Sequence, residues 1–135
     1  MEWTEALWYR DDDEDDIAAR FVSEGITPEQ LQQWLNDLAT GNLGWHILRE
    51  QISDRTAALV AIELDALGDA IRQDAADLRG SAIRAMNQKQ SVADIARSLG
   101  LTRQAASRSA NSEAGESRIM RALSDIGRTV MKEMQ

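Results

Sequence analysis

The chain has no cysteine among its 135 residues. Disulfide bonds, thiolate zinc sites and cysteine nucleophiles are therefore excluded, and the absence fits a reducing compartment. Long apolar runs are missing as well, since none approaches the ~20 residues that a helix needs to cross a bilayer. The first residues carry neither the basic nor the apolar region of a secretory signal. We therefore predict a cytoplasmic protein that does not associate with membranes.

Residues that carry catalytic chemistry are also scarce. His46 is the only histidine, so no histidine-based metal cluster or triad can form within one chain. The eight glycines are dispersed, and no glycine-rich phosphate loop is present. Spacing places two carboxylate pairs, Glu63 with Asp65 and Asp74 with Asp77, on an exposed helix face without an acid–base role. The sequence predicts no metal, no cofactor and no catalytic residue, and hence no enzyme.

Aromatic residues are absent from the second half of the chain, because all six precede residue 46. Charge divides in a similar way. Residues 1–80 hold 18 Asp and Glu against 6 Lys and Arg, a net charge of −12, whereas residues 81–135 hold 5 against 9, a net charge of +4. The overall charge of −8 thus combines an acidic portion with a basic one, which suggests two roles in one chain.

The apolar pattern is helical almost throughout, and no stretch alternates over the length of a strand. We predict an all-α fold: a helical bundle with a long central helix and a C-terminal helix-turn-helix. Residues 1–45 form an acidic, aromatic-rich helical region, and residues 46–80 form a long helix that could dimerise. Residues 81–135 form a basic region that closes with an amphipathic helix at about 117–134.

The N-terminal region contains two helix signals. The six acids at 11–16 fit a solvated linker, and they also suit the positive end of a helix at about 14–23. The run Thr27-Pro28-Glu29-Gln30 predicts a helix start, because threonine can cap, proline suits the first helical position and glutamine completes a capping box. That helix is expected to end at Gly41 or Gly44.

A long helix is predicted next, from about 46 to 78, with apolar residues at three- and four-residue steps. Gly68 or Asp69 could split it in two. Gly80 is expected to separate it from a short helix at about 81–88.

Residues 91–110 carry the most specific pattern, two short helices around a tight turn. Ser91 and Asp94 form a capping signature for the first helix. Ile95 and Leu99 are expected on its inner face, and Ala96 is small where a second helix must pass close.

The turn and the second helix follow directly. Gly100 supplies the positive φ of a tight turn, and Leu101 is expected to return into the core. Thr102 can cap a second helix at 103–110. Small residues at Ala105 and Ala106 would let that helix lie tightly against the first.

This pattern resembles the helix-turn-helix of bacterial regulators, including the region-4-like domains of sigma factors, over about 20 of the 135 residues. The matching residues are Ile95, Ala96, Leu99, Gly100 and Leu101. Two positions depart from the family pattern, because Ala106 is smaller than usual and Ser109 stands where an apolar residue is typical. These departures imply a thinly packed second helix.

The resemblance implies double-stranded DNA as the ligand, with the second helix in the major groove and the first across the backbone. The residues it places on DNA are Thr102, Arg103, Gln104, Ser107 and Arg108. Arginine can read guanine and glutamine can read adenine. Lys89, Ser91 and Arg97 are better placed for phosphate, which positions the protein without reading sequence.

One such helix reads only a few base pairs, so useful affinity implies two half-sites and a homodimer. The long helix and the helix at 117–134 are the two candidate interfaces. A sequence-specific transcriptional regulator of bacterial or phage type is therefore expected. The alternative is a protein-interaction adaptor, in which the acidic N-terminal region binds a basic partner such as a sigma factor or polymerase. Substitution of Trp3, Trp8 or Trp34 would then damage binding.

Overall fold

A computed structural model describes residues 1–11 and 13–112. The described residues form seven helices and no strand, which confirms the all-α prediction. The chain divides into two compact units, residues 1–70 (unit 1) and 71–135 (unit 2). Both the predicted helix at 117–134 and part of the acid run at 11–16 lie outside the described residues. The helices are α1 (Trp3–Ala6), α2 (Glu14–Ser23), α3 (Pro28–Thr40), α4 (Trp45–Gln51), α5 (Asp54–Asn87), α6 (Val92–Leu99) and α7 (Arg103–Asn111).

Two helix starts in unit 1 follow the sequence prediction. Three acids occupy the first turn of α2, where the helix dipole favours negative charge. At α3, the Thr27 hydroxyl accepts from the Gln30 N–H at 3.2 Å, and the Gln30 side chain accepts from the Thr27 N–H at 3.0 Å. The capping box is thus complete. Gly41 ends α3 with a φ of 79°, a conformation that costs other residues energy.

The predicted helix from 46 to 78 is wrong at its start. The chain forms the short helix α4, and extended backbone at Ile52 separates it from α5. Ser53 then caps the start of α5, because its hydroxyl accepts from the Thr56 N–H at 3.1 Å. The signal was a Ser-x-x-Thr run inside an otherwise helical apolar pattern. Apolar spacing alone did not reveal this local cap.

The predicted breaks near Gly68 and at Gly80 are also wrong, because α5 continues through both glycines to Asn87. A single glycine costs a helix only about 1 kcal/mol, which 34 residues of otherwise good helix formers can absorb. Gly80 has a different role. A Cβ at that position would lie 2.8 Å from the Ser112 hydroxyl oxygen and 3.0 Å from an Arg84 guanidinium nitrogen. Gly80 is therefore a packing residue rather than a helix end.

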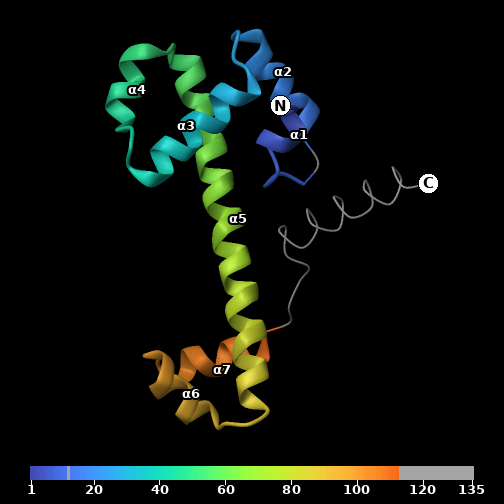
Figure 1. The fold of residues 1–135 in the computed structure, drawn as a ribbon, viewed down its shortest axis with the longest axis vertical. Helices are drawn as coiled ribbons and strands as arrows, with labels where there is room; N and C mark the ends of the chain where they lie inside the picture. Colours follow the sequence, from blue (N-terminus) through green and yellow to red (C-terminus); the bar gives the residue numbers. More distant parts are fainter. Residues whose placement is uncertain (12, 113–135) are drawn as a thin grey trace, which may run out of the picture. The chain divides into compact units, whose positions relative to one another are not determined.

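The core of unit 1 contains large side chains. Helices α1 to α4 gather around the first part of α5 (Figure 1). Trp3 stacks on the fully buried Phe21, with ring centroids 5.8 Å apart, so aromatic side chains of the N-terminal region pack in this core. The buried core residues are Leu7, Tyr9, Ile17, Phe21, Leu31, Leu35, Leu48, Val60 and Ala70.

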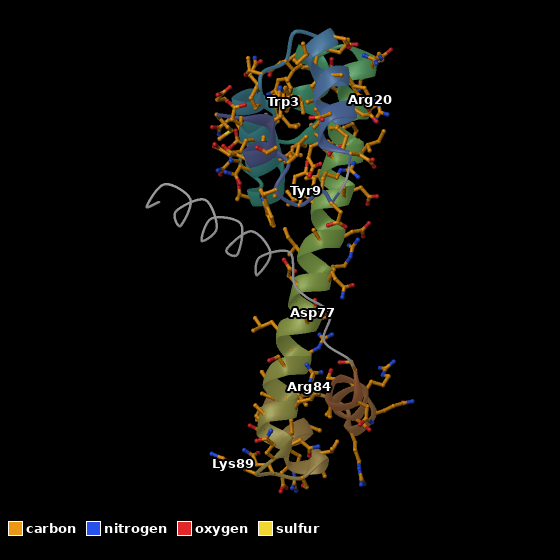
Figure 2. The ribbon with its side chains drawn as sticks, turned by 90° about the vertical axis from the view of Figure 1, so that its right-hand side faces the viewer. Trp3, Tyr9, Arg20, Asp77, Arg84 and Lys89 are labelled. Atoms are coloured by element: carbon orange, nitrogen blue, oxygen red, sulfur yellow. The ribbon has the colours of Figure 1, made fainter. Side chains whose placement is uncertain are left out.

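Glu63 corrects the prediction of an exposed carboxylate pair, because only 3% of it is exposed. The Tyr9 hydroxyl donates to one of its oxygens at 3.0 Å, and Arg10 donates to both, at 2.9 and 2.6 Å. Figure 2 shows Tyr9 beside α5. Burial, and then the neighbouring Glu63 carboxylate, raise the pKa of Tyr9 above its ordinary value. The hydrogen bond to Glu63 raises the pKa of Arg10. A buried ion pair thus ties the N-terminal segment to α5.

Asp74 was also predicted to be exposed, and it is buried, with 9% of its surface accessible. Spacing along one helix shows which residues share a face. It does not show which faces other parts of the chain cover, and this is why both carboxylate predictions failed. None of the described helices is both long and apolar enough to pass through a lipid bilayer.

Candidate nucleic-acid interface

Three elements build the candidate site in unit 2: the C-terminal part of α5, then α6 and α7 (Figure 1). Helix α6 packs against α7. Four small or branched residues are almost fully buried there: Ile83 on α5, Ile95 and Ala96 on α6, and Ala106 on α7. Because Ala96 and Ala106 are small, the two helix axes can approach closely.

The start of α6 follows the predicted capping signature. The Ser91 hydroxyl oxygen accepts from the Asp94 N–H at 3.1 Å. Asp94 forms an ion pair with Arg97, three residues further along the same helix. A carboxylate in the first turn also suits the helix dipole. Both side chains are exposed, so the ion pair contributes little to stability.

The turn between α6 and α7 is as tight as predicted. Gly100 adopts a φ of 70°, in the left-handed region. The Leu101 N–H donates to the Ala96 carbonyl at 2.9 Å, which closes the C-terminal turn of α6. The Thr102 hydroxyl then accepts from the Ala105 N–H at 3.0 Å and caps α7. Three local hydrogen-bonded features thus set the chain direction between the helices.

One inner-face prediction fails, because 46% of Leu99 is exposed, whereas Ile95 is fully buried. A step of four residues turns the helix by about 40° beyond a full turn, so Leu99 rotates away from the contact with α7. Leu101, after the turn, is half-buried. The inner apolar positions are therefore Ile95 and Leu101 rather than Ile95 and Leu99.

The predicted base-reading residues come together on α7. Arg103, Gln104 and Arg108 are exposed, and Ser107 is half-buried. Gln104 and Arg108 lie on the side of α7 opposite Ala106, which is 0% exposed, whereas Arg103 stands three residues before Ala106 at the start of the helix. Thr102 is exposed too, although its hydroxyl already caps the helix. The face of α7 that contains Ala106 thus packs within unit 2, and the exposed surface of the helix presents hydrogen-bonding groups.

The predicted phosphate contacts are less uniform. Lys89 is exposed and lies just after α5 (Figure 2). Ser91 is exposed, but its hydroxyl is occupied by the cap of α6. Arg97 is exposed and holds Asp94 in an ion pair. Among these three candidates, Lys89 is the one whose side chain takes part in neither a helix cap nor an ion pair with another described residue.

Sequence reasoning missed Asn111, which ends α7 one residue later than predicted and is exposed. It stands seven residues after Gln104, on the same side of the helix. It also missed a groove between α5 and α7, with a volume of about 440 Å³. Arg79 and Arg108 lie at this groove, together with Ala76, Leu101, Ala105, Ser109 and Ser112. Arg108 thus borders both the groove and the exposed face of α7.

Arg84 also reaches from α5 to the end of α7. Its guanidinium donates to the Ser112 carbonyl, and a second contact of 3.3 Å joins it to the Ser112 hydroxyl oxygen. Figure 2 shows Arg84 on α5 beside α7. This contact and the close approach at Gly80 fix the end of α7 against α5.

The described residues contain no cluster of three or more His, Cys, Asp or Glu side chains that could hold a metal ion. Comparison with protein-family models, with curated proteins and with solved structures finds no match to this chain. A function for this chain must therefore be inferred from the residues and geometry of unit 2.

Proposed function

We propose that the chain is a sequence-specific, double-stranded-DNA-binding transcriptional regulator that acts as a dimer. The observation that carries this proposal is the division of α7 into two faces. Ala106 is completely buried, Gln104 and Arg108 are exposed on the other side, and Arg103 is exposed at the start of the helix. A capped helix on a tight turn that presents arginine and amide groups suits the major groove of DNA.

The roles of the residues follow from their positions. Arg103 and Arg108 are assigned to guanine and Gln104 to adenine, because these side chains match the base edges bidentately. Lys89 is assigned to phosphate, with Arg97 as a second contact that exchanges Asp94 for the DNA backbone. Neither Arg103 nor Arg108 forms an ion pair with any other described residue. Their charges can therefore bind DNA without breaking an ion pair to another described residue.

The charge distribution supports the same assignment. Residues 81–135 carry +4 and residues 1–80 carry −12. Phosphate attraction is therefore local to unit 2, and the acidic portion opposes nonspecific binding. Specific base contacts must then supply much of the affinity for a chosen site.

The test is a binding selection with purified full-length protein and fragmented genomic DNA at two salt concentrations. The proposal expects a short palindromic site whose affinity falls as salt rises. Arg103→Ala/Arg108→Ala should lose that site, because each arginine is worth about 1–3 kcal/mol of base discrimination. The matched control, Arg20→Ala/Arg49→Ala, removes two positive charges from exposed positions in unit 1 and should retain it. Equal enrichment of all sequences, or equal loss in both variants, would contradict the proposal.

A protein-interaction adaptor is the second candidate, and exposed apolar groups in unit 1 favour it. Trp45 is 69% exposed, Ile47 47% and Trp8 39%. Trp3 is half-buried and stacks on Phe21, so its substitution would disturb folding rather than report on a partner. Trp45→Ala and Trp8→Ala are the informative variants. If the chain is an adaptor, they should weaken binding to purified RNA polymerase holoenzyme, while Arg103→Ala/Arg108→Ala leaves it unchanged.

A further inference from the structure

One side of α5 within unit 2 is apolar and uncovered. It consists of five residues, the α5 stripe: Ile71, Ala75, Leu78, Ala82 and Ala85. All five are exposed, Ile71 by 52% and Leu78 by 72%. Their spacing of four, three, four and three residues is that of a coiled-coil seam, which averages 3.5 residues per turn.

The described helices α6 and α7 do not cover this stripe. Among the residues of α5 that pack in unit 2 are Ala76 at the groove, Gly80 beside Ser112, and the buried Ile83. At about 100° per residue, these three lie on the side of α5 opposite the stripe. An isolated exposed leucine is ordinary, but a seam of this regularity marks an interaction surface.

We propose that the α5 stripe is the dimer interface, and that its occupant is the same stripe of a second copy in parallel orientation. The seam matches itself in spacing and shape. Alanine at alternate seam positions lets two helix backbones approach, and Ile71 and Leu78 fill the layers between. A two-fold axis along the seam gives a closed pair in which each residue meets its own copy.

The charges beside the seam select the parallel orientation. Arg79, which is exposed, lies along one flank of the α5 stripe, and Asp77, which is half-buried, lies along the other. In a parallel pair, rotation about the two-fold axis places the basic flank of each helix beside the acidic flank of its partner. An antiparallel pair would instead place like charges side by side, which is unfavourable.

The parallel pair also has a geometric consequence for DNA binding, and this step rests on the proposed function. Each copy carries α6 and α7 on the side of α5 that faces away from the seam. Two parallel copies therefore present their α7 helices at the same end of the pair and on its two outer sides. Two half-sites on one face of DNA require two recognition helices that are arranged in this way.

The first test is the mass of the full-length protein by analytical ultracentrifugation without DNA. The wild-type protein should be a dimer, and Leu78→Glu should weaken dimerisation by at least about 100-fold, because it buries an unpaired charge. Ile62→Glu is the matched control. Ile62 is 57% exposed on the same helix but about 180° around from Ile71, so dimerisation should be unchanged. A monomeric wild type, or equal loss of dimer in both variants, would overturn the proposal.

The second test establishes orientation and uses the absence of native cysteine. Ala75→Cys and Ala82→Cys should each form an intermolecular disulfide with its own copy in a parallel pair. An antiparallel pair would cross-link only when the two variants are mixed, which would overturn the orientation. These measurements need no DNA, so loss of DNA binding with an intact dimer would reject the regulator and leave the interface standing.

Discussion

The two units are held together by different kinds of contact. Unit 1 surrounds large buried side chains, among them Tyr9, Phe21 and Leu31, and buries the carboxylate of Glu63. Unit 2 has no aromatic residue and packs Ile83, Ile95 and two alanines, with its helices positioned by caps and one close glycine. The packing of large apolar side chains therefore determines the structure of unit 1. Helix caps and backbone geometry instead position the helix pair that carries the candidate interface.

The largest expected effect tests the aromatic core of unit 1. Phe21→Ala should lower the free energy of unfolding by about 3–5 kcal/mol, because a cavity opens beside Trp3. Denaturant titration followed by tryptophan fluorescence reports on unit 1, since all four tryptophans lie within it. Val22→Ala, at the neighbouring 59%-exposed position, should change the free energy by less than about 0.5 kcal/mol. Similar shifts in both variants would mean that Phe21 is not a core residue.

The next effect concerns the buried ion pair. Glu63→Gln should lower the free energy of unfolding by about 2–3 kcal/mol, because Arg10 loses its counter-charge and an amide donor is left facing it. Asp65→Asn, at an exposed position two residues along α5, is the control and should have little effect. The triple variant Tyr9→Phe/Arg10→Leu/Glu63→Leu, which leaves no hydroxyl unpaired at this position, should be less destabilised than Glu63→Gln. A triple variant that is worse would show that the polar cluster itself stabilises unit 1.

The next prediction tests whether the close approach at Gly80 holds α7 in place within unit 2. Gly80→Val should destabilise the packing of α7 by about 1–3 kcal/mol, since its Cβ would crowd Ser112 and Arg84. Gly68→Val is the control, because a Cβ there meets nothing within 4 Å. Hydrogen exchange of the α6 and α7 amides measures the effect. Exchange that is unchanged in Gly80→Val would mean that α7 does not depend on α5 for its position.

Local signals made unit 2 the more predictable of the two. Ser91, Gly100 and Thr102 each act within a few residues, and the structure places all three as predicted. Spacing along α7 likewise identified the exposed face that contains Gln104 and Arg108. Such features depend on hydrogen bonds and backbone angles that are encoded next to each other in the chain.

Two of the failed predictions depend on distant contacts. Gly80 was read as a helix end, whereas its role is defined by Ser112, 32 residues away. Glu63 was read as exposed because its partners, Tyr9 and Arg10, lie more than 50 residues earlier. The break before α5 was missed for the opposite reason. The cap at Ser53 is local, but it was hidden within a continuous apolar pattern.

The smallest expected effect compares one cap in each unit. Thr27→Ala and Thr102→Ala each remove a hydroxyl that accepts from the backbone, at 3.2 and 3.0 Å, and each should cost about 1 kcal/mol of local stability. The consequences should differ. Thr102→Ala should weaken binding to the selected DNA site by roughly fivefold, because that loss frays the helix start that carries Arg103. Thr27→Ala should leave DNA affinity unchanged, since α3 belongs to unit 1.

Fluorescence anisotropy with a labelled copy of the selected site measures both affinities under the same salt. Thr102→Ser is the decisive companion, because serine restores the capping oxygen and should return the affinity to that of the wild type. If serine fails to do so, the threonine methyl group contacts DNA directly, and the effect does not come from the cap. If Thr27→Ala weakens binding as much as Thr102→Ala does, the two units do not divide stability and recognition between them.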